Sequence, residues 1–262
     1  MAKYKFTAPG GMVKGLFADM LKQTHLLIAG ASGSGKSVLI NGLICAGLHF
    51  FPGDQPGGVE FVFLDAKRTE LWAYRNVPHC LAYGSEPEEM ARVLQKVLQM
   101  IDERYRRMQA TGMLKYDGSA VYVVIDELAD MMTTNKRLYQ PLIQRIAQIG
   151  RAANVHLITA TQTPLREVIP TPIKCNYDGV VALRTLNAQD SRNIIGRTGA
   201  ELLPRYGECL YHTPEFGNNI YQYAIPYTTD AEKAALVEHW AKQYNKQKRG
   251  VLRRIIRFFT EV

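Results

Sequence analysis

The sequence predicts an α/β protein with a mainly parallel central sheet flanked by helices. Short, continuous apolar runs recur along the 262 residues, and such runs are typical of strands that are buried on both faces. Helical patterns or loops separate the runs, as in the crossover connections between parallel strands. Five runs are predicted strands: residues 26–29, 61–64, 121–125, 156–160 and 180–183.

The longest predicted helix covers residues 86–109. Ser85 and Glu88 have the spacing of a capping box, in which two side chains satisfy the first free N–H groups of a helix. Apolar side chains then repeat at helical spacing along one face, and we expect this face to pack on the core. The face consists of Val93, Val97, Ile101, Tyr105 and Met108.

The C-terminal part of the sequence predicts a β-hairpin followed by a helix. Residues 208–212 and 220–224 flank a turn-forming stretch that contains proline, glycine and asparagine. Thr229 and Glu232 form a second capping-box pattern, so the final helix should begin at Thr229. We expect this helix to end near Gly250.

A glycine-rich loop directly follows the first predicted strand. In such a loop, backbone N–H groups and the start of the following helix bind phosphate. Lys36 would reach the β- and γ-phosphates of a nucleotide, and the Ser37 hydroxyl would coordinate Mg²⁺. The sequence therefore predicts ATP and Mg²⁺ as ligands here. The predicted nucleotide-binding residues are Gly30, Ala31, Ser32, Gly33, Ser34, Gly35, Lys36 and Ser37.

Two carboxylates close the predicted strand at residues 121–125. Asp126 is predicted to hold Mg²⁺ through water, and Glu127 to orient or deprotonate the water that attacks the γ-phosphate. Acids at a strand end also cap helices, but the phosphate-binding loop earlier in the chain favours the catalytic interpretation. Gln162 follows another predicted strand, and its amide could sense the γ-phosphate or align the water; a plain polar strand end is the alternative.

Arg151 is a further candidate catalytic residue. Hydrolysis needs positive charge beside the departing phosphoryl group, and an arginine from another subunit often supplies it. Arg151 lies just before the predicted strand at residues 156–160. From the residues alone, an ordinary surface arginine is the simpler interpretation.

The charge of the chain is unevenly distributed. The formal net charge is +8, from 32 basic and 24 acidic residues, which favours a polyanionic partner. Residues 242–262 hold seven basic residues and one acidic residue, so most of the long-range attraction belongs to this segment. No apolar run approaches the roughly 18 residues of a membrane span, and the cysteines lack the spacing of a zinc site. We expect a cytoplasmic protein.

The order of these motifs resembles the FtsK/SpoIIIE DNA translocases, in the HerA–FtsK branch of RecA-like ATPases. The resemblance covers roughly residues 20–212 and extends well beyond the phosphate-binding loop. It includes Asp65-Ala66-Lys67, Glu70-Leu71, Tyr74, Glu103-Arg104-Tyr105, Asp126-Glu127-Leu128-Ala129-Asp130-Met131, Arg151-Ala152-Ala153, His156-Leu157-Ile158, Ala160-Thr161-Gln162 and Asp190-Ser191-Arg192. It implies a RecA-like P-loop ATPase fold.

The resemblance also implies roles for individual residues. Lys36 and Ser37 match the Walker A pair, and Gln162 matches the sensor. Asp126 and Glu127 match the Walker B pair.

Arg151 matches the family's arginine finger, which acts on the site of a neighbouring subunit. A finger in trans implies a ring, and the family's ring is a homohexamer that threads double-stranded DNA. The implied function is an ATP-driven double-stranded DNA translocase.

Two positions depart from the family pattern. Family members have Arg after the sensor Gln and Lys shortly before the Asp-Ser-Arg motif, whereas this chain has Thr163 and Ala188. Two expected DNA-phosphate contacts are therefore missing. Other basic residues could replace them, because a phosphate contact needs only positive charge within reach; ordinary solvated side chains are the alternative. The candidates are Arg192, Arg184, Arg166 and Lys174.

We expect residues 1–249 to form an FtsK-type motor domain and residues 250–262 a basic amphipathic tail. The tail alternates basic and apolar residues at near-helical spacing. It could lie on a membrane surface, dock on a partner or neighbouring subunit, or contact DNA; packing on its own domain is the alternative. We find no counterpart of the family's membrane anchor, its oligomerising domain or its winged helix. A role in conjugative or plasmid transfer or in DNA packaging fits a motor alone.

Two rival functions remain at this stage. The protein-secretion ATPases of the same superfamily move polypeptides, and the residues at Thr163 and Ala188 keep this alternative open. A nucleotide-gated binding module with little turnover is disfavoured by Asp126, Glu127 and Arg151.

Overall fold

The computed structural model describes residues 10–50, 58–162 and 169–246. These residues form one eight-stranded sheet with the strand order β3-β2-β4-β5-β1-β6-β7-β8. The first six strands of the chain pair in parallel, and β7 and β8 pair antiparallel at one edge. The strands are β1 His25–Ala29, β2 Val59–Leu64, β3 Cys80–Gly84, β4 Ala120–Ile125, β5 Val155–Thr161, β6 Gly179–Ala182, β7 Glu208–His212 and β8 Tyr221–Ala224.

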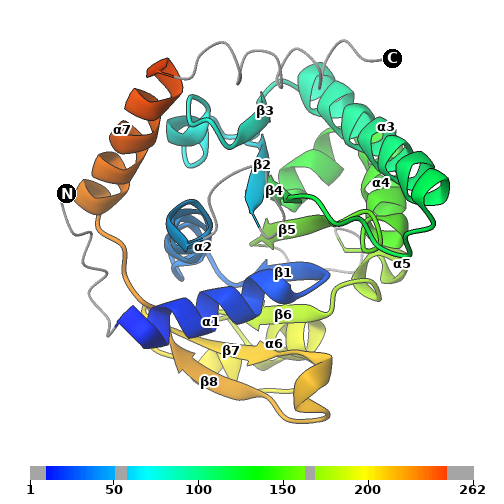
Figure 1. Cartoon of the computed structure of the whole chain (residues 1–262). Coiled ribbons are helices and arrows are strands. Elements are labelled where there is room, and N and C mark those ends of the chain that lie inside the picture. Colours follow the sequence, from blue (N-terminus) through cyan, green and yellow to red (C-terminus); the bar gives the residue numbers. More distant parts are fainter. Residues whose placement is uncertain (1–9, 51–57, 163–168, 247–262) are drawn as a thin grey trace.

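Helices cover both faces of the sheet (Figure 1). One apolar core lies between the sheet and α1, α2 and α7, and the other between the sheet and α3, α4, α5 and α6. The helices are α1 Gly10–Lys22, α2 Lys36–Phe50, α3 Pro87–Thr111, α4 Leu128–Ile149, α5 Thr171–Lys174, α6 Ala188–Ile195 and α7 Asp230–Lys246. Single 3₁₀ turns are η1 Trp72–Tyr74, η2 Ala200–Leu202 and η3 Pro214–Phe216.

This architecture confirms the predicted fold class, including the C-terminal hairpin and helix. The predicted strands all form, with ends that differ by a few residues at most. The capping box of α7 also forms, since the Thr229 N–H donates to the Glu232 carboxylate at 2.8 Å and the Glu232 N–H donates to the Thr229 hydroxyl at 3.1 Å. The described part of α7 ends at Lys246, and Gly250 lies outside the described residues. None of the described helices has the length and apolar character that a bilayer crossing requires.

Two details of the prediction were wrong. Strand β3 was not predicted, and it forms the edge of the sheet beside β2. The capping box of α3 uses Glu86 and Glu89, not Ser85 and Glu88. The cause is Pro87, whose fixed φ suits the first helical position and excludes the residue before it from the helix. Glu86 is therefore the cap.

Helix α4 connects β4 to β5 and separates two functional candidates in the chain. Glu127 caps its start, and Arg151 follows its end. The helix contains Pro141 and is interrupted at Asn135, whose backbone is non-helical with φ −157° and ψ 78°. The Asn135 side chain accepts the Leu138 N–H at 3.1 Å and so caps the second half.

The central strand β1 begins at a buried histidine. His25 Nδ1 accepts the Leu157 N–H at 2.9 Å, so the ring donates from Nε2 to the Ala147 carbonyl, also at 2.9 Å. Burial, with a smaller contribution from His156, lowers the pKa of His25 to about 4. Protonating Nδ1 would remove the acceptor for Leu157. The neutral ring therefore joins β1 to β5 and to the end of α4.

We expect the protein to lose stability as the pH falls from about 6.5 towards 4. The pKa of His25 is lower in the folded chain than in the unfolded chain, so below pH 6.5 only the unfolded chain gains the proton. Between pH 7 and pH 5 this one residue should remove about 2 kcal/mol of unfolding free energy. Urea unfolding at both pH values measures the loss, and His25→Gln should reduce it. An equal loss in the variant would assign the effect to other groups.

Candidate functional site

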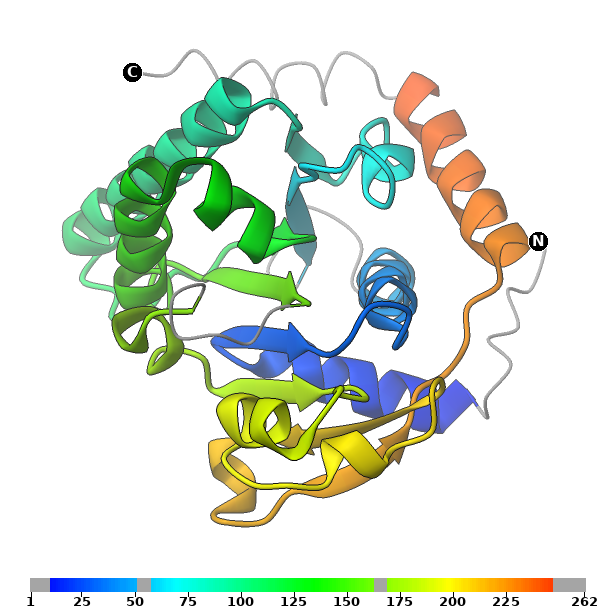
Figure 2. The ribbon, with the colours of Figure 1, turned by 180° about the vertical axis from the view of Figure 1, so that it is seen from behind.

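The glycine-rich loop connects the end of β1 to the start of α2, as Figure 2 shows. Gly33 and Gly35 adopt φ values of 69° and 100°, in the left-handed region that disfavours other residues. Gly30 has no room for a side chain, because an added Cβ would lie 2.8 Å from both Leu183 Cβ and Ser34 Oγ. The three glycines are thus required by the loop's own backbone.

Neighbouring strands hold this loop in place. The Gly30 N–H donates to the Thr161 carbonyl at the end of β5 at 3.4 Å. The Ala31 N–H donates to the Arg184 carbonyl, just beyond β6, at 2.8 Å. The loop therefore sits at the carboxyl edge of the parallel strands, where ligands of open α/β sheets bind.

Lys36 lies inside the loop and is buried. Its Nζ donates to the Gly30 carbonyl at 2.8 Å and to the Ala31 carbonyl at 2.9 Å. Burial lowers the pKa of Lys36 to about 8, against the opposing influence of Glu127 and Asp126. The ammonium is therefore charged at neutral pH and rests where phosphate oxygens could replace the carbonyls as acceptors.

The loop also contains a buried polar atom without a hydrogen-bond partner among the described residues. This atom is the hydroxyl oxygen of Ser34. Such groups are uncommon, because desolvation costs roughly 1–3 kcal/mol without a partner. With the loop N–H groups and Lys36, this hydroxyl fits the phosphates of a nucleotide.

Glu127 is fixed at the same edge by backbone donors. Its carboxylate accepts the Gln162 N–H at 3.0 and 3.3 Å and the Ala129 N–H at 3.4 Å. Only 3% of the residue is exposed. The structure thus brings Glu127 and the backbone of Gln162 together, and the contact from Gln162 positions the predicted general base.

The pKa of Asp126 is shifted in the opposite direction from the pKa of Lys36. Burial, with the negative charges of Asp65 and Glu70, raises the pKa of Asp126 to about 6. A divalent cation would relieve both effects, because it compensates the buried charge and the mutual repulsion. Ser37, half-buried at the start of α2, is the other predicted ligand. This donor set of carboxylate and hydroxyl oxygens fits Mg²⁺.

Lys67 was not among the predicted site residues. Its Nζ lies 3.5 Å from a carboxylate oxygen of Glu127 and 3.5 Å from one of Asp130. Burial lowers the pKa of Lys67, but Glu127, Asp130 and Asp126 together raise it above the usual value. The sequence shows only that Lys67 comes shortly after strand β2, and the contact depends on the pairing of β2 with β4. Lys67 therefore holds the Glu127 carboxylate in place through an ion pair.

Arg151 does not join this cluster within one chain. It is exposed and follows α4, just before β5 begins at the amino edge of the sheet. The 22 residues of α4, with their break at Asn135, separate it from Glu127 in the chain. Arg151 therefore lies away from the phosphate-binding loop of its own chain, which is at the carboxyl edge of the sheet.

The candidate DNA contacts differ in their surroundings. Arg184 and Arg192 are exposed, and the Arg192 guanidinium donates to the Gln189 side chain at 3.4 Å. The ammonium of Lys174 donates to the Asn193 carbonyl of α6, which gives it a structural role. Arg166 lies outside the described residues, as do Thr163 and the tail at residues 250–262.

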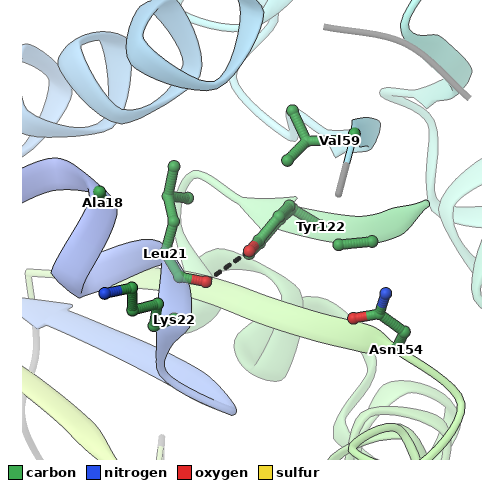
Figure 3. Close-up of a pocket in the computed structure, with 8 residues that line it drawn as sticks. Ala18, Leu21, Lys22, Val59, Tyr122 and Asn154 are labelled. Carbon is green, nitrogen blue, oxygen red and sulfur yellow. Dashed lines mark hydrogen bonds between the residues drawn. The ribbon is translucent and has the colours of Figure 1, made fainter. Parts of the chain in front are cut away.

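A separate pocket of about 220 Å³ opens at the amino edge of the sheet (Figure 3). Its wall includes Leu21 and Lys22 of α1, and Val59 and Ala120 at the starts of β2 and β4. The Tyr122 hydroxyl donates to the Leu21 carbonyl and so ties α1 to the sheet. The pocket is mostly apolar and lies at the opposite edge from the phosphate-binding loop.

We expect MgATP to bind most tightly between about pH 6 and pH 8. Below pH 6 the Asp126 carboxylate is protonated, and above pH 8 Lys36 loses its charge. Each change should weaken binding by up to about tenfold per pH unit. Titration calorimetry from pH 5 to pH 9 measures both limbs. Asp126→Asn should flatten the acid limb and keep the alkaline one; an unchanged acid limb would contradict the assignment.

Comparison with known proteins points to one family. A model of the FtsK/SpoIIIE family matches residues 7–120 and 117–165. DNA translocase FtsK of Lactiplantibacillus plantarum is 39% identical over 216 residues, which cover 74% of this chain and 26% of the relative. DNA translocase SpoIIIE of Bacillus subtilis is 33% identical over 252 residues, covering 88% of this chain and 32% of the relative. The chain thus spans about a third or less of these curated relatives.

Solved structures share the fold. The pCW3 conjugation coupling protein TcpA has a TM-score of 0.72 at 22% identity, with 84% of this chain and 66% of that chain covered. The cytoplasmic domain of the type VII secretion ATPase EccC from Thermomonospora curvata has a TM-score of 0.69 at 21% identity, with 83% and 28% covered. The chain therefore shares its α/β fold with both of these proteins. With the family model matching most of its length, the chain belongs to the FtsK/SpoIIIE family.

Proposed function

We propose that this chain is the motor of an ATP-driven double-stranded DNA translocase. The observation that carries the proposal is the gathering of Lys36, Asp126 and Glu127 at one edge of the sheet. Family membership supports it, as do curated relatives named DNA translocases. Residues 1–249 would form the motor domain.

Hydrolysis would proceed by in-line attack of water on the γ-phosphate. Lys36 would move from the Gly30 and Ala31 carbonyls to the phosphate oxygens and stabilise their charge. Glu127 would take the proton of the attacking water, while the Gln162 N–H keeps the carboxylate in place. Mg²⁺ held by Ser37 and, through water, by Asp126 would offset the charge of the β- and γ-phosphates.

A complete site would need a second subunit. Arg151 lies at the opposite edge of the sheet from Lys36, so this arginine would come to the bound ATP from a neighbouring copy. Copies that each give an arginine to the next form a ring when the rotation between neighbours closes. We propose a homohexamer, the ring that the family resemblance implies.

Double-stranded DNA would pass through this ring and contact basic side chains. Arg184 and Arg192 are the exposed candidates. The basic tail at residues 250–262 would add charge, on DNA, on a partner or at a membrane surface. Such contacts release counterions, so DNA binding should depend strongly on salt. A cytoplasmic location follows from this substrate.

The rival is a motor that moves polypeptide instead of DNA. Thr163 and Ala188 favour it, since they replace two basic residues of the family pattern. The response of ATP turnover to DNA separates the two functions.

We expect linear duplex DNA to stimulate ATP hydrolysis severalfold at low salt. The stimulation should fade as the salt concentration rises, because salt weakens the binding of DNA phosphates to basic side chains. Phosphate release at several salt concentrations measures it, and Lys36→Ala, which removes the phosphate contact, is the inactive control. A rate that no DNA changes at low salt would contradict the translocase and favour the rival.

Mixed rings test the shared site. We expect Lys36→Ala and Arg151→Ala to reduce turnover by at least about a hundredfold each, because each removes a charge that stabilises the transferring phosphoryl group. Equal mixtures should regain measurable activity, since some interfaces then pair an intact loop with an intact Arg151. Arg106→Ala, an exposed arginine on α3, is the matched control. Mixtures without recovery would show that Arg151 does not act between subunits.

A further inference from the structure

The turn between η2 and β7, residues 203–207, lies beside the phosphate-binding loop. A methyl group added to Gly33 would lie 3.7 Å from Nη2 of Arg205. Arg205 therefore lies at the rim of the loop of its own subunit. In the sequence it follows Gly33 by about 170 residues.

The turn is anchored at both ends. Leu203 is buried, and its N–H donates to the Ala200 carbonyl at 3.4 Å. The Gly207 carbonyl accepts the Ile225 N–H at 2.7 Å, and the φ of 84° at Gly207 turns the chain into β7. Arg205 thus extends from a fixed segment of backbone.

A second set of hydrogen bonds joins this region to the loop. The Ala200 carbonyl also accepts the Thr185 N–H at 3.2 Å. The preceding residue, Arg184, supplies the carbonyl that holds the Ala31 N–H at 2.8 Å. The backbone of the turn and the backbone of the loop are therefore connected through the strand end after β6. Their relative position is set by main-chain bonds.

The Arg205 side chain has no anionic partner. It is exposed, and it makes no hydrogen bond or ion pair with another described residue. Its guanidinium lies 5.2 Å from the ring centre of Tyr206, within the range of a cation–π contact. This contact orients the guanidinium and leaves its N–H donors available.

We propose that Arg205 binds the phosphates of the nucleotide held by its own subunit. The inference rests on the nucleotide site proposed above. A guanidinium presents planar donors that match two phosphate oxygens, which explains an arginine here better than a lysine. Arg205 would thus act in cis, beside the same loop that an Arg151 from the neighbour approaches in trans.

Binding measurements with Arg205→Ala test the proposal. We expect about tenfold weaker affinity for ATP, the loss of one charge-assisted hydrogen bond at a partly solvated site. Arg205→Lys should recover part of the affinity, and Arg106→Ala on α3 should leave it unchanged. Fluorescent ATP and ADP analogues with Mg²⁺ serve as probes, and thermal unfolding without nucleotide confirms that the variants fold.

Each outcome decides a separate point. A loss for ATP alone assigns Arg205 to the γ-phosphate, and an equal loss for ADP assigns it to the inner phosphates; both support the proposal. Unchanged affinity for both nucleotides in a folded Arg205→Ala protein overturns it, as does weaker DNA binding with intact nucleotide binding. If the unaltered protein binds neither nucleotide, the proposed function fails instead.

Discussion

The parallel pairing of β1 with β5 on one side and β6 on the other is the constraint on which the site depends. This pairing brings the ends of three buried strands to one edge, and two backbone hydrogen bonds then fix the loop between β5 and β6. The loop glycines, the Lys36 ammonium and the Gln162 N–H take their positions from this edge. A one-residue shift in the register of β1 would move each of its side chains to the other face of the sheet. The loop residues that follow β1 would then be displaced as well.

The residues of the site are held in a state that is costly without a ligand. Lys36 and Asp126 are both buried, and burial favours the neutral form of each. It lowers the pKa of Lys36 and raises the pKa of Asp126. The buried Glu127 carboxylate has partners already, since it accepts backbone N–H groups and forms an ion pair with Lys67. A bound nucleotide with its cation would supply the opposite charges. The site is therefore built for its ligand at some expense to the stability of the empty protein.

The sequence predicts the strands and the loop well because each has a local cause. Continuous apolar runs identify buried strands, and a glycine-rich turn before a helix identifies the phosphate site. Strand β3 was missed because Cys80–Gly84 contains no β-branched residue and lies at a sheet edge. The contact of Lys67 with Glu127 depends on β2 lying beside β4, and the position of Arg205 depends on a distant turn. No local pattern contains such information.

Helix α4 has a mechanical consequence that neither of its ends shows alone. The residue before its first turn is Glu127, which belongs to the subunit's own site, and shortly after its last turn comes Arg151, which would serve the next site. The break at Asn135 divides helix α4 into two segments. A change in the backbone angles of Asn135 would alter the distance between Glu127 and Arg151, and in the proposed ring it would couple one nucleotide site to the next.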